Sequence, residues 1–165
     1  MKKFLIPAGF KEKDLPKDCI YEVFDDKYTF MAVDKVVESN KLEWIRKRTD
    51  IYGENSYSHY SRYLNPKHEE RRELRRRINH TQYDFFKGQK DATKRELKKK
   101  VIIFLWNNFP YVIESFYMNG ILITILRVNS DVDSGCCKEK IPDFITPGED
   151  ISENEAYYTN KIVER

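Results

Sequence analysis

Arginine and lysine recur at alternate positions in several segments of this chain, a spacing that places side chains on one face of a β-strand. The candidate set is Arg46, Arg48, Arg62, Arg75, Arg77 and Lys99. If several of these side chains point into one cavity, they cannot neutralise one another, and their combined field favours a multiply charged anion such as a phosphate chain. If they point outward, they solvate the sheet. The pattern therefore predicts either a phosphate site or a charged surface.

The sequence lacks the short motifs that identify the common catalytic and metal sites. It contains no Gly-rich phosphate loop, no His-Glu-x-x-His, no Cys-x-x-Cys and no nucleophile elbow. Its three cysteines, Cys19, Cys136 and Cys137, are an odd number with no histidine at ligand spacing. They indicate neither a disulfide framework nor a zinc site. No catalytic residue is therefore assigned.

Two of the arginine segments are expected to be the strands of one hairpin. In Leu42 to Thr49, Trp44, Arg46 and Arg48 share one strand face. The turn-forming sequence DIYGEN follows, and the next strand, SYSHYSRYL, carries Arg62. The segment KHEERRELRRRIN has the propensity of a helix, but its charges also suit a strand whose alternate side chains point into a polar interior. Periodicity leaves both structures open.

The remaining segments predict mainly strands. Cys19 to Val37 is rich in β-branched and aromatic residues and is expected to form one or two strands, broken at Asp25-Asp26. Asn107-Asn108 and Asn119-Gly120 mark turns between the later strands, and Asn79 to Gly88 has the capping residues of a short helix. About eight strands, one to three helices and no βαβ alternation predict an α+β protein built on an antiparallel sheet or closed barrel.

Length and composition fit one domain. The chain has 165 residues and a net charge of +3, with the basic excess between Lys67 and Lys100 and an acidic segment from Asp131 to Glu155. No stretch approaches the roughly 20 apolar residues of a membrane span, and the opening MKKFLIPAGF is interrupted by Pro and Gly, unlike a secretory signal. We expect a single cytoplasmic domain over 1–165, with an N-terminal extension at 1–18 and a C-terminal helix region at 147–165.

Several segments together resemble a known family. WIRKRTDIYGENSYSHYSR resembles the Arg-rich hairpin of CYTH-like domains, and more closely that in the C-terminal domain of the Trpl-translocation-defect family of ATP/GTP-binding proteins. The likeness continues in order and approximate spacing through RINHTQYDFF, KKKVIIFLWNNFPYVIESFY and IPDFITPGEDISENEAYYTN. It covers roughly Glu22 to the C-terminus, and FLWNN is more specific than the Arg-x-Arg pair.

The resemblance implies an antiparallel triphosphate-tunnel barrel, in which inward Arg and Lys hold phosphates and inward carboxylates hold Mg²⁺ or Mn²⁺. Carried over by position, Arg46, Arg48, Arg62 and Lys99 would be phosphate contacts, and Glu73 would be a metal-binding carboxylate. The barrel would also make RRELRRR a strand, against its helical propensity.

The chain departs from the family's pattern chiefly in its acids. The family opens with a Glu-x-Glu-x-Lys strand, whereas IYEVFDDKY offers only Glu22, Asp26 and Lys27. An acid expected on the strand that begins near Tyr111 appears as Ser115, with Glu114 expected out of phase. One or two carboxylates hold a divalent ion poorly. The family's P-loop nucleotide domain does not occur in this sequence, so a separate nucleotide-binding protein is a candidate partner.

These observations favour a CYTH-like domain that binds a phosphorylated small molecule or lipid headgroup in a basic tunnel without efficient catalysis. One alternative is a divergent Mg²⁺- or Mn²⁺-dependent triphosphatase, whose candidate carboxylates are Glu22, Asp26, Glu73 and Glu114. Another is an RNA-binding or protein-interaction module that uses the basic run Arg71 to Arg77, with Tyr and Trp available to stack bases.

Overall fold

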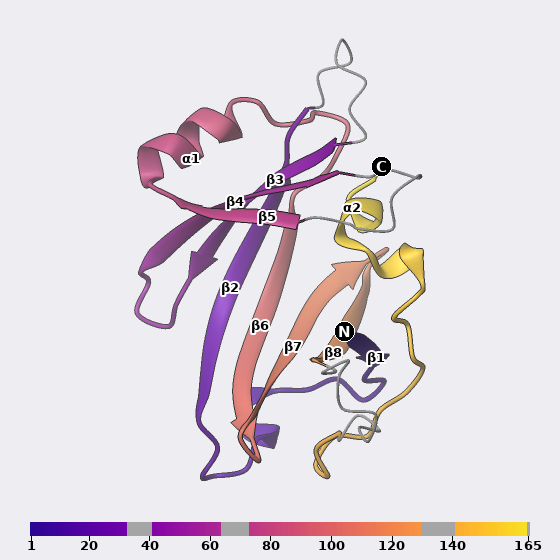
Figure 1. Ribbon diagram of the computed structural model, residues 1–165. Coiled ribbons are helices and arrows are strands. Elements are labelled where there is room, and N and C mark those ends of the chain that lie inside the picture. The colour runs from indigo at the N-terminus through magenta and orange to yellow at the C-terminus, as the bar shows by residue number, and fades with distance from the viewer. Residues whose placement is uncertain (33–40, 64–72, 130–140, 165) are drawn as a thin grey trace. The chain divides into compact units, whose positions relative to one another are not determined.

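Eight strands form one antiparallel sheet in the computed structural model, with the hydrogen-bonded order β1-β8-β7-β6-β2-β3-β4-β5 (Figure 1). The structure describes residues 1–32, 41–63, 73–129 and 141–164. The strands are β1 (Lys2–Leu5), β2 (Tyr21–Phe30), β3 (Lys41–Thr49), β4 (Asn55–Tyr63), β5 (Glu73–Ile78), β6 (Leu97–Trp106), β7 (Phe109–Met118) and β8 (Ile121–Val128). The helices are α1 (His80–Lys87) and α2 (Thr159–Ile162), with 3₁₀ turns at Glu12–Asp14 and Glu155–Tyr157.

The strand count and the α+β class agree with the sequence-based prediction, but the closed barrel is not confirmed. The order has β1 at one end and β5 at the other, so the sheet is not closed among the described strands. The described residues form two units, one comprising Met1–Asp25 with Lys99–Tyr158, the other Asp26–Lys98 with Thr159–Arg165. We call them the first and the second unit, and each is described by itself.

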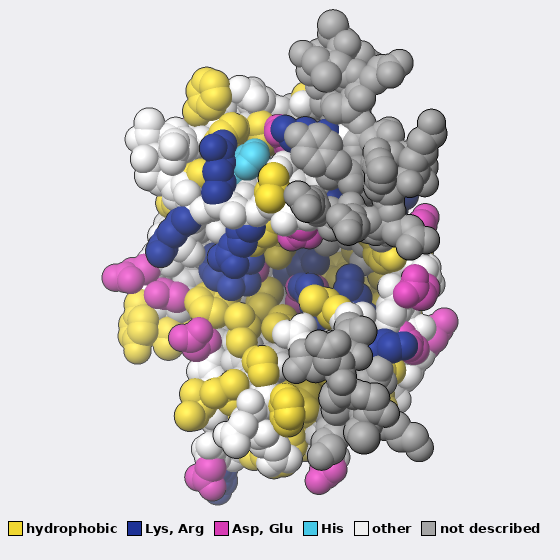
Figure 2. Space-filling view, in the orientation of Figure 1, with side chains coloured by type: hydrophobic (Ala, Val, Ile, Leu, Met, Phe, Trp, Pro, Cys, Tyr) yellow, Lys and Arg dark blue, Asp and Glu magenta, His cyan; other side chains and the backbone are white. Residues whose placement is uncertain are grey.

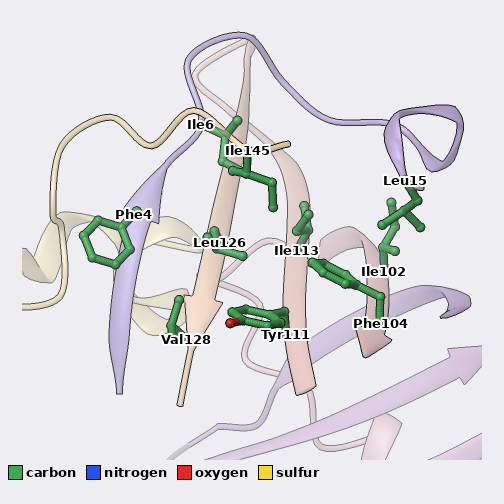
Figure 3. Close-up of a cluster of buried hydrophobic side chains, with 10 residues drawn as sticks. All are labelled: Phe4, Ile6, Leu15, Ile102, Phe104, Tyr111, Ile113, Leu126, Val128 and Ile145. Carbon is green, nitrogen blue, oxygen red and sulfur yellow. The ribbon is translucent and has the colours of Figure 1, made fainter. Parts of the chain in front are cut away.

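The core of the first unit lies on one face of β6, β7 and β8 and is completed by β1. Register brings Ile102, Ile113 and Leu126 into one row across the three strands. All three side chains are buried, together with Phe4, Ile6, Leu15, Phe104, Tyr111, Val128 and Ile145 (Figure 3). The alternation of apolar side chains along each strand therefore becomes one hydrophobic cluster.

The two predicted asparagine turns of the first unit are both present. Asn107 and Asn108 have φ of 50° and 67°, and Asn119 and Gly120 have φ of 52° and 77°. Two-residue turns of this kind need left-handed backbone at both positions, which Asn and Gly adopt most readily. They join β6 to β7 and β7 to β8 as antiparallel hairpins.

Strand β1 occupies part of the region that we expected to be an extension. It pairs with β8, and its other side is covered by a segment near the C-terminus. The Leu5 amide donates to the Glu149 carbonyl at 2.9 Å, and the Gly148 amide donates to the Leu5 carbonyl at 2.7 Å. A Cβ atom at Gly148 would lie 2.9 Å from Pro7 Cγ, so only glycine permits this approach.

The predicted C-terminal helix region is mostly not helical. Besides the 3₁₀ turn at Glu155–Tyr157, only the four residues of α2 are helical within it. The physical reason is that the backbone at 148–151 hydrogen-bonds to β1, which requires an extended chain. Further on, Ile162 and Val163 are buried. Neither helix of the described residues has the length and apolarity needed to cross a membrane.

Helix α1 covers one face of the second unit's sheet (Figure 1). The Asn79 side chain accepts a hydrogen bond from the Gln82 amide and caps the helix, which ends at Gly88, as predicted. Tyr83 of α1 packs with Met31, Ile45 and Ile78 of the sheet. This packing holds α1 against the strands that carry the candidate arginines.

Two ambiguous segments are resolved as strands. The described part of RRELRRR is β5, as the family resemblance implied, because pairing with β4 satisfies its backbone. The expected break at Asp25-Asp26 is wrong, since β2 runs without interruption from Tyr21 to Phe30. Asp26 is buried in that strand because Arg48 neutralises its carboxylate, which overrides the local preference for a turn.

Candidate anion-binding site

The register of β3, β4 and β5 sorts their side chains into two faces, because directly paired residues of antiparallel strands point to the same side. We call one of them the arginine face. Its members are Leu42, Trp44, Arg46, Arg48, Ser56, Ser58, Tyr60, Arg62, Glu73, Arg75 and Arg77. The opposite face holds the buried residues that pack against α1, and also Lys47 and Arg76. Five of the six predicted phosphate contacts thus share one face.

An aromatic ladder crosses the arginine face from β2 to β4. The ring centroids of Phe30 and Trp44 are 5.6 Å apart, and those of Trp44 and Tyr60 are 5.2 Å apart with the rings almost parallel. The guanidinium groups of Arg46 and Arg75 lie 5.5 Å and 5.9 Å from the Tyr60 centroid. Both distances are within the range of cation–π attraction, so one ring orients two cations.

Arg46 is the most unusual member of this face. It is 7% exposed, and its Nε is buried without a hydrogen-bond partner among the described residues. Within the same residues it makes no ion pair, and its guanidinium lies over the Tyr60 ring. A buried donor without a partner lowers stability by about 1–3 kcal/mol, and more when the group is charged. The Arg46 guanidinium is therefore a candidate partner for a bound anion.

Arg48, two residues further along β3, is in the opposite situation. Its Nε donates to Asp26 Oδ1 at 2.8 Å and its Nη2 donates to Asp26 Oδ2 at 2.7 Å. Partial burial opposes the charged form, but the hydrogen bonds and charge of Asp26 raise the pKa of Arg48 above its usual value. The two parallel hydrogen bonds fix both side chains, and they leave the Asp26 carboxylate already paired with a cation.

The outer part of the arginine face is open to solvent. Arg75 and Arg77 on β5 are exposed, and Arg62 on β4 is half-buried opposite Glu73 in the register. Figure 2 shows Lys and Arg side chains gathered over the part of the view in which Figure 1 draws β5. Between Arg46 and Arg77 the register places Ser58, which is buried.

Lys99, the sixth predicted contact, belongs to the first unit and is paired there with an acid. Its Nζ is buried 3.2 Å from Glu114 Oε2, and Arg127 Nη1 donates to Glu114 Oε1 at 2.9 Å. Burial opposes ionisation, but the charges of Lys99 and Arg127 hold the pKa of Glu114 at about 2. The expectation that Glu114 is out of phase is wrong. Glu114 lies opposite Val101, and Val101 is two residues from Lys99 on β6, so Glu114 and Lys99 share one face of the sheet.

Sequence reasoning missed two residues of these clusters, although alternation places each on a defined face of its own strand. Tyr60 is in phase with Arg62 on β4, so it had to share the arginine face. Arg127 is in phase with Ile125 on β8, and Ile125 lies opposite Glu114. In each case the missing information was the partner strand's register, which fixes what an in-phase residue meets.

The carboxylates that the family resemblance would assign to Mg²⁺ or Mn²⁺ do not fit a metal site. No group of three His, Cys, Asp or Glu that could hold a metal ion occurs in the described residues. Glu22 and Glu73 are both exposed, while Asp26 and Glu114 are each held by cations. A divalent ion needs several oxygen ligands free to converge on it. Cys136, Cys137 and Arg71 lie outside the described residues.

Comparison with known proteins identifies the fold but no family. No protein-family model matches the chain, and no curated protein matches its sequence. The hypothetical protein NE1496 has a similar solved structure, with a TM-score of 0.54, 14% identity and coverage of 98% of this chain and 95% of that one. PH1012 from Pyrococcus horikoshii OT3 has a TM-score of 0.46, 15% identity and coverage of 79% and 80%. A "putative adenylate cyclase" from Bacillus halodurans has a TM-score of 0.42, 9% identity and coverage of 75% of each chain.

Proposed function

We propose that the arginine face binds the phosphate groups of a phosphorylated ligand, such as a polyphosphate, a nucleotide or a phosphoinositide headgroup. The observation that carries this proposal is Arg46, a buried cation whose Nε has no partner among the described residues. The resemblance of the hairpin to CYTH-like domains, whose barrel binds triphosphates, supports the same chemistry.

The arrangement of the guanidinium groups suits phosphate better than a single carboxylate. A guanidinium group attracted to an aromatic ring still has N–H donors at its edges, and these match the oxygens of a phosphate in pairs. Arg46 and Arg75 lie 5.5 Å and 5.9 Å from the centroid of the same Tyr60 ring, so one aromatic side chain orients both sets of donors. Several phosphate groups would be needed to balance the Arg46, Arg75 and Arg77 charges together.

The ion pairs made by the carboxylates favour ligand binding without efficient hydrolysis. Metal-assisted hydrolysis would need an ion that bridges phosphates and orients water. Asp26 is already bound by Arg48, and Glu114 by Lys99 and Arg127. A metal would have to displace those cations before either acid could ligate it.

The test is calorimetric titration of the purified chain with tripolyphosphate, ATP and inositol phosphates at moderate salt. Arg75 and Arg76 provide a matched pair, since they are neighbouring, exposed arginines whose side chains point to opposite faces of β5. Arg75→Ala should weaken binding about ten-fold or more, the usual contribution of a hydrogen bond to a charged group. Arg76→Ala should leave it nearly unchanged.

Four results would count against the proposal. Failure of all three ligands to bind would end it, as would equal losses in the two arginine variants. Phosphate release with Mg²⁺ or Mn²⁺ that disappears in Glu73→Gln would replace it with the triphosphatase alternative. Steeply salt-dependent binding to long single-stranded RNA, unaffected by Arg46→Ala, would favour an RNA-binding module.

A further inference from the structure

A lysine outside the strands lies at the far end of the aromatic ladder from Arg75. Lys94 Nζ is 5.4 Å from the centroid of the Phe30 ring, and Phe30 stacks on Trp44. The Phe30 and Tyr60 centroids are separated by no more than the 5.6 Å and 5.2 Å steps of the ladder taken together. The ladder therefore has a lysine over its β2 end and two arginines over its β4 end.

The chain fixes Lys94 in place through its backbone. Lys94 forms a β-bridge with Glu164, and the next residue, Arg95, donates from its amide to the Val163 carbonyl at 3.0 Å and from Nε to the Ile162 carbonyl at 3.2 Å. Hydrogen bonds with residues 162–164 thus hold the segment that carries Lys94 in place. The side chain is partly buried, so its position is set by packing as well as by the ring.

Glu164, the bridge partner of Lys94, and Glu96, two residues away, are each paired with other lysines. Glu164 Oε1 is 3.6 Å from Lys161 Nζ. The Glu96 carboxylate is 3.2 Å from Lys27 Nζ and 3.5 Å from Lys90 Nζ. These two lysines lower the pKa of Glu96 in spite of the opposing effect of its partial burial. In the described part of the chain Lys94 makes no ion pair, and its Nζ lies over the Phe30 ring.

We propose that Lys94 is a further phosphate contact, which binds a second anionic group of the ligand that the arginine end holds. This inference rests on the proposed function. Trp44 stacks between Phe30 and Tyr60 and brings no charge, so we assign the lysine and the two arginines to separate anionic groups of the ligand. The site accordingly favours ligands whose anionic groups are spread along the ladder over those with one compact group.

The experiment compares Lys94→Met with Lys98→Met in titrations with orthophosphate and with a longer linear polyphosphate. Methionine keeps most of the aliphatic side chain and removes the charge, and Lys98 is an exposed lysine of β6 that serves as the control. Lys94→Met should weaken binding of the polyphosphate about ten-fold and leave orthophosphate binding unchanged. Lys94→Arg, which keeps the charge and the ring contact, should restore most of the affinity.

The outcomes separate this inference from the proposed function. If the wild-type chain binds neither probe, the arginine face itself is not a phosphate site. If the polyphosphate binds and Lys94→Met weakens it no more than Lys98→Met, the arginine face stands and the role of Lys94 is refuted. An equal loss for orthophosphate and polyphosphate would also refute it, because the lysine would then act on the same anionic group as the arginines.

Discussion

Replacing Arg46 by methionine should stabilise the unliganded protein and at the same time weaken ligand binding. The wild-type guanidinium buries an Nε that has no described partner, which costs about 1–3 kcal/mol. Its attraction to the Tyr60 ring returns about 0.5–2 kcal/mol, and methionine fills much of the same space. The net gain should be about 1 kcal/mol, a rise of roughly 2–4 °C in Tm for a chain of this size.

Tripolyphosphate should reverse the order of the wild-type and Arg46→Met Tm values. A ligand at one hundred times its Kd stabilises the protein that binds it by about 2.7 kcal/mol. Arg46→Met should lose most of this effect, so its Tm should be above wild type without ligand and below wild type with it. Thermal unfolding followed by circular dichroism, with and without ligand, measures both values.

Lys47→Met is the matched control for this reversal. Lys47 is adjacent to Arg46 on β3 and points to the opposite face, so its removal changes the net charge equally. It should shift neither Tm by much. The reasoning is refuted if Arg46→Met lowers the Tm of the unliganded protein by several degrees while the ligand-induced rise stays at the wild-type value. Arg46 would then be a structural residue whose charge is satisfied within the fold.

Two further predictions concern the buried ion pairs. Asp26→Asn removes the charge from the carboxylate that holds Arg48 and should lower the free energy of unfolding, measured by urea titration, by about 3 kcal/mol. The control Asp25→Asn, at the exposed neighbouring residue, should have little effect. A loss below about 1 kcal/mol for Asp26→Asn would contradict the buried-pair argument. The pKa of Glu114, about 2 in the folded protein and 4.5 ordinarily, predicts roughly 3 kcal/mol of stability that is fully present above about pH 4.5 and is lost as pH falls toward 2. Carboxyl titration by NMR should place the Glu114 midpoint near 2, and a midpoint near 4.5 would show that Lys99 and Arg127 do not stabilise its charge.

Alternation along single strands was enough to predict which arginines share a face. Arg46 and Arg48 lie two residues apart on β3, as do Arg75 and Arg77 on β5, and any regular strand puts such pairs on one side. The turns at Asn107-Asn108 and Asn119-Gly120 were equally predictable, because the left-handed backbone they need is a local property.

What the sequence could not reveal depends on contacts between distant residues. The propensity of β5 favours a helix, and only its pairing with β4 decides for a strand. The sequence Asp25-Asp26 is typical of a turn, and only the ion pair between Asp26 and Arg48 explains why it lies within a strand. Lys94 lies outside the strands, so no alternation predicts that its amine meets the Phe30 ring.

The two terminal strands of the sheet are protected from self-association in different ways. Strand β1 already has its outer backbone groups occupied by the segment at 148–151, so another molecule has nothing to pair with there. Strand β5 instead carries three consecutive exposed arginines, Arg75, Arg76 and Arg77. A second copy docking along β5 would bring like charges together, so the arginines that we propose as phosphate contacts also keep this strand from seeding aggregates.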